Sequence, residues 1–357
     1  EAGQAGQDQD QGTGMKRQPP FTLGKGAVPA GERATIELPM ARLYTHSEMS
    51  LPVHVVHGKQ AGPTLFVSAA IHGDEINGVE IIRRLLRNRS INRIKGTLLA
   101  IPVVNPYGFI QRSRYLPDRR DLNRSFPGSP TGSLASRIAH LFMQEIVCRS
   151  THGIDIHTGS NYRSNLPQIR TDLEDDENLR MASAFGTPMI IHSGIRDGSL
   201  REAVTEHGIP VLLYEAGEAL YFNESAIRSG VRGIVNVMRT IGMLPRSRKA
   251  RGQEPLIAEK TSWVRAPRSG VFFKKATLGS LVHKGDTLGI INDPLGYESE
   301  QIQAPFTGVI IGQLTLPLVH EGDALVHLAK VADLDEAEVA LDDYASTLTE
   351  EDFGLER

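Results

Sequence analysis

The chain has 357 residues, which is long for one average domain and makes two domains the first expectation. Its 39 basic and 42 acidic residues nearly balance, which argues against the cationic surface of a nucleic-acid-binding protein. No apolar run approaches the roughly 18 residues that a membrane-spanning helix needs, so no membrane partner is expected. Cys148 is the only cysteine, which excludes an intrachain disulfide and a thiolate metal site and fits a reducing cytoplasm.

The two ends of the chain differ in composition from the middle. Residues 1–30 open with a Gly/Gln-rich stretch that has almost nothing to bury, so this segment is predicted to be a disordered tail. Residues 332–357 carry ten acidic residues and one basic residue, which predicts an acidic tail or a short surface helix. The true N-terminus and the role of the acidic segment are left open by the sequence.

Between residues 31 and 248, short apolar runs alternate with amphipathic stretches. Short runs rich in Val, Ile and Leu and bounded by Gly or Pro are typical of buried strands, and they occupy residues 63–70, 96–105, 153–159, 188–194 and 210–217. Helical spacing predicts helices over residues 77–88, 133–150, 200–208 and 223–244, the first with Asn77 as N-cap and Glu80 in a capping-box position. This alternation predicts an α/β layer fold with a largely parallel sheet.

After a polar stretch predicted to be a linker, residues 249–262, the chain repeats itself within residues 263–331. The copies pair residues 266–271 (APRSGV) with 304–309 (APFTGV), and 282–286 (VHKGD) with 319–323 (VHEGD). A two-copy repeat of short strands and Gly-Asp turns predicts a small β-barrel or sandwich. It resembles the barrel-sandwich fold of biotinyl and lipoyl carriers, but the connection at residues 291–297 has no lysine, so a scaffold is predicted.

The strongest local motif for chemistry is HGDE, at residues 72–75, directly after one predicted strand and before a helix. The carboxyl end of a buried strand is where α/β folds place ligand sites. His72 and Glu75 are three residues apart, close enough for both to reach one metal ion. Zinc favours imidazole and carboxylate ligands, and catalytic zinc sites use three protein ligands.

Two further strand ends supply matching side chains. His157 follows an apolar strand, with Asp155 two residues earlier on the same face, where it could orient a ligating imidazole. A satisfied buried histidine with a structural aspartate is the alternative. Glu215 ends another buried strand, where a carboxylate without a partner would be costly, and a metal site at the same sheet edge would supply one.

The loop at residues 112–124 has five arginines in thirteen residues. A solvated run of charges is the default interpretation. A dense guanidinium cluster beside a metal would instead bind carboxylates through paired hydrogen bonds.

Taken together, these residues resemble the succinylglutamate desuccinylase/aspartoacylase family, relatives of the zinc carboxypeptidases. The resemblance covers roughly residues 34–330 through HGDE with the NGVE helix, DLNR-x-FPG, DIHTG and the strand ending in E-x-G. It implies a carboxypeptidase-like mixed sheet flanked by helices, plus a C-terminal barrel-sandwich domain. It also implies one zinc ion per chain, bound by His72, Glu75 and His157, although cobalt or manganese also suits such ligands.

The resemblance further implies roles for the surrounding side chains. Glu215 corresponds to the general acid/base, and Asn123 and Arg124 to the pair that holds a substrate carboxylate. An upstream arginine polarises the scissile carbonyl; Arg114 is the best match, with Arg112 and Arg120 left open because the spacing to DLNR is about two residues too long. Tyr297 is the candidate for a tyrosine that the C-terminal domain contributes, and residues 160–170 are expected to line the pocket.

The implied activity is zinc-dependent hydrolysis of the amide bond of an N-acyl amino acid or similar small N-acylated metabolite. A zinc metallocarboxypeptidase acting on peptides is the alternative enzyme, and an inactive metal- or ligand-binding protein is the non-enzyme alternative. The separation of Glu75 from His157 by roughly 80 residues and the appended β-domain favour the deacylase. The acyl group, the amine and the oligomeric state, including a homo-oligomer, are not given by the sequence.

Overall fold

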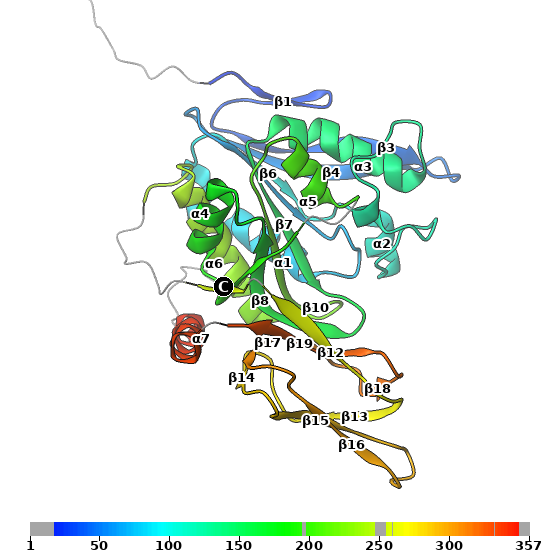
Figure 1. Ribbon diagram of the computed structural model, residues 1–357. Helices are drawn as coiled ribbons and strands as arrows, with labels where there is room; N and C mark the ends of the chain where they lie inside the picture. The colour runs from blue at the N-terminus through cyan, green and yellow to red at the C-terminus, as the bar shows by residue number, and fades with distance from the viewer. Residues whose placement is uncertain (1–17, 195–197, 247–254, 259, 332, 350–357) are drawn as a thin grey trace, which may run out of the picture.

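The computed structural model describes residues 18–194, 198–246, 255–258, 260–331 and 333–349. Within these ranges a mixed sheet of thirteen strands dominates (Figure 1). Its main path runs in the order β12 (Thr261–Arg265), β19 (Ala324–Lys330), β17 (Gly308–Leu314), β8 (Arg163–Thr171), β10 (Val211–Glu218), β7 (His152–Gly159), β5 (Thr64–Ala69), β6 (Thr97–Ile101), β4 (Glu48–His57) and β3 (Arg33–Arg42). Beside this path lie β9 (Met189–His192), β11 (Leu256–Ala258) and β14 (Leu281–Val282).

The sheet is parallel at its centre and again where β9 pairs with β8 and with β11. Strands β10, β7, β5 and β6 run parallel to one another, whereas β4, β3, β8 and β17 join antiparallel on the two sides. The alternation of strands and helices predicts the parallel centre but not the flanking strands, so the sheet is less parallel than that pattern alone suggests. The mixed α/β architecture that the family resemblance implies is the one found.

Helices cover both faces of the sheet. On one face pack α1 (Asn77–Arg87), α4 (Asp176–Phe185) and α6 (Glu224–Thr240); on the other lie α3 (Leu134–Glu145) and α5 (Leu200–Glu206). The side chains of β5 reach both faces, because successive side chains of a strand point to opposite sides. Leu65 and Val67 pack in the hydrophobic core beneath α1, α4 and α6, the first core. Phe66 packs in the second core, beneath α3 and α5. The predicted strands and helices of residues 63–244 are all present. Short connections are α2 (Pro106–Gln111), η1 (Arg89–Arg93), η2 (Leu122–Arg124) and η3 (Val147–Arg149).

Two local predictions near the start of the chain are wrong. Residues 18–30 fall in the predicted disordered tail, but β1 (Phe21–Leu23) and β2 (Gly26–Val28) form an antiparallel hairpin there, because Leu23 and Val28 are buried in the second core. Asn77 is not the N-cap of α1, which is Ile76. The Asn77 side chain instead donates to the Ala216 carbonyl and accepts from the Asn223 amide, so tertiary contacts take its capping groups. Residues 1–17 lie outside the described chain.

The C-terminal strands build two sheets. Strands β12, β17 and β19 extend the large sheet through the antiparallel pairing of β17 with β8, and β11 of the predicted linker pairs with β9. A separate four-stranded sheet has the order β16 (Ser299–Gln303), β15 (Thr287–Asn292), β13 (Gly270–Lys274) and β18 (Leu318–Val319). The end of the chain forms α7 (Leu334–Thr349), which packs Ala337 and Ala340 inward; residues 350–357 of the predicted acidic tail lie outside the described chain.

The two copies of the repeat are joined by matching hydrogen bonds. In each Gly-Asp turn the aspartate side chain accepts from the histidine amide three residues earlier, Asp286 from His283 and Asp323 from His320. Each turn also bonds to the alanine of the other copy: Gly285 donates to the Ala304 carbonyl, and Gly322 to the carbonyl of Ala266. The sequence repeat is therefore matched by a reciprocal set of contacts.

No helix within the described ranges combines the length and the apolar character that crossing a membrane requires.

Candidate active site

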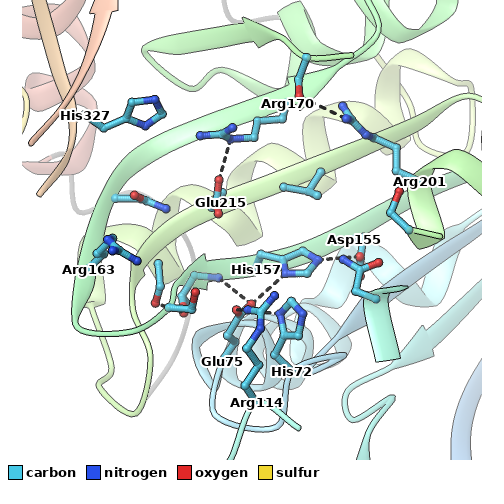
Figure 2. Close-up of a pocket in the computed structure, with 18 of the residues that line it drawn as sticks. His72, Glu75, Arg114, Asp155, His157, Arg163, Arg170, Arg201, Glu215 and His327 are labelled. Carbon is cyan, nitrogen blue, oxygen red and sulfur yellow. Dashed lines mark hydrogen bonds and ion pairs between the residues drawn. The ribbon is translucent and has the colours of Figure 1, made fainter. Parts of the chain in front are cut away.

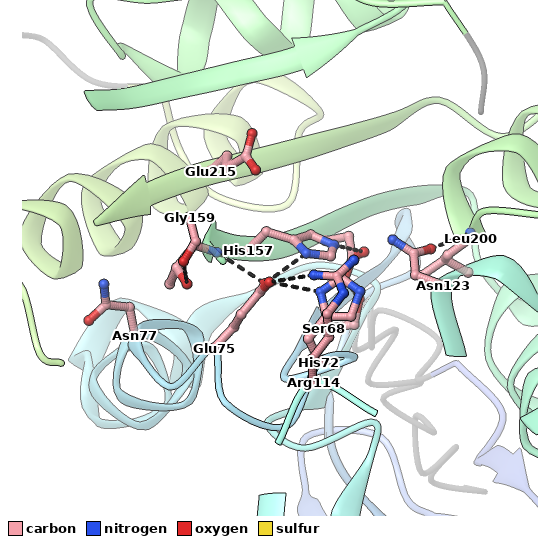
Figure 3. Close-up of polar contacts among 12 residues, drawn as sticks. Ser68, His72, Glu75, Asn77, Arg114, Asn123, His157, Gly159, Leu200 and Glu215 are labelled. Carbon is pink, nitrogen blue, oxygen red and sulfur yellow. Dashed lines mark hydrogen bonds and ion pairs between the residues drawn. The ribbon is translucent and has the colours of Figure 1, made fainter. Parts of the chain in front are cut away.

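Three strand ends meet at one edge of the parallel centre. His157 of β7 pairs in register with Glu215 of β10, and Ser68 of β5 pairs with Asp155 of β7. His72 and Glu75 lie in the turn that leads from β5 into α1. Since neighbouring strands are about 4.8 Å apart, the register brings these side chains into one group, as Figure 3 shows.

The donor atoms of His72, Glu75 and His157 all lie within 4.8 Å of one another, and all three side chains are buried. The Nδ1 atom of His72 is 2.8 Å from Oε1 of Glu75, and Nδ1 of His157 is 2.9 Å from Oε2 of the same carboxylate. The Thr158 amide donates to Glu75 Oε2 at 3.1 Å. Two imidazole nitrogens and a carboxylate converging in this way form a donor set suited to zinc.

An aspartate holds the outer nitrogen of each imidazole. The Nε2 atom of His72 is 3.2 Å from Oδ1 of Asp121, and Nε2 of His157 is 2.8 Å from Oδ2 of Asp155. Ser68 in turn donates to Asp155 at 2.7 Å. Because a carboxylate only accepts, each Nε2 carries the hydrogen, which directs the lone pair of Nδ1 toward Glu75 when the ring is neutral.

Charge in the cluster favours a cation between the three donors. Burial works to raise the pKa of Glu75, but His72 and His157 outweigh it and hold this pKa well below its usual range. Burial also works to lower the pKa of His157, and Asp155 and Glu75 outweigh it and raise the pKa well above its usual range. The surrounding carboxylates thus stabilise positive charge at Nδ1, and a divalent metal ion would take the place of the protons there.

Helix α2, which leads into the loop that carries Arg114, packs tightly against the HGDE turn. A Cβ at Gly73 would lie 1.9 Å from the Gly108 carbonyl carbon, so only glycine allows this approach of two backbones. Arg114 donates to Asp121 Oδ2 at 2.9 Å and lies 3.4 Å from Glu75 Oε1. Arg112 and Arg120 are exposed and absent from the cavity wall. The arginine beside the candidate metal site is therefore Arg114.

Asn123 and Arg124 lie in η2, and both line the same cavity. The Oδ1 atom of Asn123 accepts from the Leu200 amide at 2.8 Å, which ties the loop to the start of α5. This bond does not involve the Nδ2 group of Asn123. The Arg124 Nη1 atom donates to the Asn123 carbonyl at 2.5 Å. Figure 3 shows Asn123 beside Leu200, with His72, His157 and Arg114 between it and Asn77.

Glu215 has a partner that the sequence pattern did not reveal. Its Oε2 atom is 2.7 Å from Nε of Arg170 on β8, and both side chains are largely shielded from solvent (Figure 2). Register explains the meeting, because Gln168 of β8 pairs with Glu215 of β10 and Arg170 follows two residues later on the same face. Arg201 of α5 also lines the cavity. Arg170 is the last residue of the segment expected to line the pocket, residues 160–170, but the sequence did not indicate its contact with Glu215.

The cavity has a volume of about 540 Å³ and takes its far wall from the C-terminal strands. Trp263 of β12 and His327 of β19 line this wall, together with Ser160, Arg163 and Asn165 from the segment expected to do so. Tyr297 was predicted wrongly: its side chain is 83% exposed in the β15–β16 connection and does not reach the cavity. That connection belongs to the four-stranded sheet, whereas β12 and β19 belong to the sheet that carries the site.

Comparison with known proteins gives a consistent result. Residues 61–241 match the sequence model described as the succinylglutamate desuccinylase/aspartoacylase catalytic domain. The chain is 26% identical to N-alpha-acetyl-L-2,4-diaminobutyric acid deacetylase of Halomonas elongata over 79% of this chain and 86% of that protein. A succinylglutamate desuccinylase/aspartoacylase structure from Rhodobacter sphaeroides superposes with a TM-score of 0.75 at 26% identity, covering 84% of this chain and 96% of that one. The product-bound ectoine utilization protein EutE (DoeB) of Ruegeria pomeroyi shares the fold, with a TM-score of 0.76 at 24% identity over 87% and 98% of the two chains.

Proposed function

The chain belongs to the succinylglutamate desuccinylase/aspartoacylase family, and on this premise we propose that it is a zinc-dependent deacylase that hydrolyses the amide bond of an N-acyl amino acid or a similar small N-acylated metabolite. One observation carries the proposal. The donor atoms of His72, Glu75 and His157 converge within 4.8 Å, and the same cavity contains Glu215 and Arg114. The deacetylase of Halomonas elongata, whose name gives an N-acetylated amino acid as substrate, supports the substrate class.

Zinc would be held by Nδ1 of His72, Nδ1 of His157 and the Glu75 carboxylate, one ion per chain. When bound at such ligands, zinc lowers the pKa of a coordinated water and polarises a carbonyl group. The aspartates behind the two imidazoles would fix the ring orientation and increase the basicity of the ligands. Cobalt or manganese would suit the same donors, so metal identity is part of the test.

The chain's own residues would perform the proton transfers and the charge stabilisation. Glu215 accepts a proton from the attacking water and later delivers it to the departing amine nitrogen. Arg114 donates to the carbonyl oxygen as negative charge develops there, a contribution worth roughly 3–4 kcal/mol if it equals one oxyanion-hole donor. Asn123 and Arg124 hold the carboxylate of the amino-acid portion. Arg170 keeps the Glu215 carboxylate in place between turnovers.

We further propose the domain limits that the sequence suggests: a hydrolase domain over residues 31–248, a linker over 249–262 and a barrel-sandwich domain over 263–331. The reciprocal contacts of the two Gly-Asp turns support the last of these. In this arrangement the C-terminal strands form the outer wall of the substrate cavity and bear no carrier function.

The first experiment is the metal content of the purified protein, wild type beside His157→Ala, followed by a deacylation screen over N-acyl amino acids. We expect about one zinc per chain in the wild type and loss of zinc in the variant. His140→Ala is the matched control, since His140 lies on α3 and does not line the cavity. Wild type that stays metal-free after zinc is supplied contradicts the proposal and favours an inactive binding protein, whereas cleavage of peptides but not of acyl amino acids favours a carboxypeptidase.

A further inference from the structure

Gln168 of β8 is a polar side chain that is completely buried. Its exposed fraction is 0%, and neither Oε1 nor Nε2 has a hydrogen-bond partner among the residues that the structure describes. An amide that leaves water without forming a new hydrogen bond destabilises the fold, so buried side-chain amides are nearly always bonded. The position of Gln168 therefore requires an explanation other than stability.

Strand register places Gln168 in one row with Glu215 and a metal ligand. Gln168 pairs with Glu215 of β10, and Glu215 pairs with His157 of β7. On its other side Gln168 pairs with Met189 of β9, which belongs to an apolar cluster. Side chains at opposite positions of an antiparallel pair share one face, with Cβ atoms about 4.5–5.5 Å apart. Of the two register partners, Glu215 is the one with a carboxylate to which the amide can donate.

The contact of Glu215 with Arg170 supplies charge but not direction. The Nε atom of Arg170 lies 2.7 Å from Oε2 of Glu215 (Figure 2), yet this buried Nε has no hydrogen-bond partner, so its N–H bond is not aligned with the oxygen. Glu75, by contrast, accepts from the Thr158 amide and has an imidazole nitrogen within 2.9 Å of each oxygen. The orientation of the Glu215 carboxylate is thus less fixed than that of Glu75.

A group that transfers protons must keep its position throughout the reaction. Glu215 has to face the attacking water and then the leaving nitrogen, and a misplacement of about 1 Å can lower a rate by roughly 100-fold. The Gln168 amide lies on the same face of the sheet, and burial restricts its motion. A small rotation of either side chain would join Nε2 of Gln168 to the carboxylate of Glu215.

We propose that Gln168 is a positioning residue for Glu215, bonded to its carboxyl group during the reaction while Arg170 balances the charge. The inference rests on the proposed function, in which Glu215 carries the proton. An amide suits this role because it both donates and accepts: Nε2 donates to the carboxylate before proton uptake, and Oε1 accepts from the carboxylic acid afterwards. The unpaired amide of the resting protein then lowers stability in favour of catalysis, a recurrent trade-off at active sites.

Gln168→Met tests the proposal, because methionine is a similarly long, unbranched side chain without the amide. We expect a higher midpoint of denaturant unfolding, since two unpaired polar atoms leave the interior. In the zinc-loaded protein, kcat for an N-acyl amino acid should fall by about tenfold to hundredfold, the effect of one hydrogen bond to a charged group. The KM and the zinc content should be unchanged. Higher stability together with lower kcat distinguishes positioning from a purely structural role.

Gln313→Met is the matched control. Gln313 of β17 is also buried, but its Nε2 group donates to the Ala276 carbonyl at 2.7 Å, and its side chain does not line the cavity. We expect lower stability and an unchanged kcat, the reverse of the result for Gln168→Met. If Gln168→Met is instead less stable than the wild type and keeps its kcat, the amide has only a structural role and the proposal is refuted.

A double-mutant cycle tests whether Gln168 acts through Glu215. Added to Glu215→Gln, Gln168→Met should lower kcat by less than about twofold, because the group to be positioned is already lost. A further tenfold loss in the double variant would show that Gln168 acts on another part of the site and would overturn the proposal. An active wild type beside an equally active Gln168→Met refutes the positioning role alone, whereas a zinc-loaded wild type without deacylase activity overturns the proposed function and this inference with it.

Discussion

The two walls of the cavity hold their charged groups in different ways. On the wall built by the parallel strands, His72, His157 and Glu75 are buried, and each has a hydrogen-bonding partner that fixes its orientation. On the wall that the C-terminal strands complete, the guanidinium carbon of Arg163, from β8, lies 5.2 Å from the centre of the Trp263 ring, which in turn stacks on His327.

This difference follows from what each wall must do. Side chains that bind a metal and move protons need a fixed geometry, and buried hydrogen bonds to carboxylates supply it. Stacking on an aromatic ring orients a guanidinium without using its N–H groups. The variants below affect one wall at a time.

Glu215→Gln should have the largest effect. We expect turnover to fall by about 10²–10⁴-fold, the usual contribution of a general acid/base, with zinc content unchanged. The emission of Trp263, on the other wall, should stay close to that of the wild type. Glu218→Gln on the same strand is the control, since Glu218 contacts Thr315 and lies off the cavity wall. Near-normal turnover in Glu215→Gln would exclude its role.

Asp121→Asn should weaken zinc binding without abolishing it. Asp121 orients His72 and pairs with Arg114, and loss of such a partner commonly lowers metal affinity by about 10–100-fold. The measurement is competition with a chelator of known affinity. Asp118→Asn in the same loop is the control, because Asp118 pairs only with the exposed Arg120 among the described residues. Equal zinc affinity in the two variants would show that Asp121 does not support the ligand.

Gly312→Ala should disturb only the outer wall. An added Cβ would lie 2.9 Å from Oδ1 of Asn165, 3.0 Å from Cβ of His327 and 3.4 Å from the Trp263 ring, so these side chains would have to shift by a few tenths of an ångström. We expect the KM for an N-acyl amino acid to change by less than about tenfold, since no charged group is removed. The kcat should stay close to that of the wild type. A fall in kcat would mean that the two walls are not independent.

Glu224→Gln lies outside both walls and should have the smallest effect. Glu224 accepts two hydrogen bonds from Arg84, at 2.7 and 2.8 Å, and one from Arg228 at 2.8 Å. The bonds from Arg84 have the largest effect, and together with Arg228 they outweigh burial and lower the pKa of Glu224 from 4.5 to about 2. A lowered carboxyl pKa stabilises the fold above pH 4.5 and loses this effect as the pH falls toward 2. Because both side chains are partly exposed, the difference in unfolding free energy should stay below about 1 kcal/mol.

Denaturant unfolding at several pH values measures this difference. It should be largest near pH 7 and shrink as the solution is acidified, while activity at neutral pH is unchanged. Glu174→Gln, an exposed position, serves as the control. A difference between wild type and Glu224→Gln that does not vary with pH would contradict the assigned cause.

The sequence predicts the chemistry of the first wall better than that of the second. His72, Glu75 and His157 each stand in or directly after a buried strand, and the meeting of parallel strand ends at one edge is a general rule, so their proximity could be expected. The contact between Arg170 and Glu215 depends on which strand pairs with β10, and no local pattern contains that information. Trp263 and His327 come together through the register of two C-terminal strands that the repeat alone does not specify.

The errors in prediction have the same origin. Asn77 has the sequence of an N-cap, yet its side chain bonds to Ala216 and Asn223, residues far away along the chain. Tyr297 belongs to the C-terminal part of the chain, which does contribute to the cavity wall. It lies in a connection of the four-stranded sheet, however, where its side chain is exposed to solvent. Local pattern predicts elements and strand ends, whereas tertiary pairing decides which side chains share a site.

The continuity of the sheet from β10 through β8 to β17 restricts how substrate preference can be altered by design. Shifting the pairing of β17 on β8 by one residue would turn every side chain of the outer wall to the opposite face, so register cannot be adjusted gradually. Nor can the C-terminal strands swing outward without breaking a ladder of backbone hydrogen bonds. The outer wall of the cavity is therefore best reshaped by replacing its side chains, such as those at positions 163, 263 and 327, on a backbone that stays where it is.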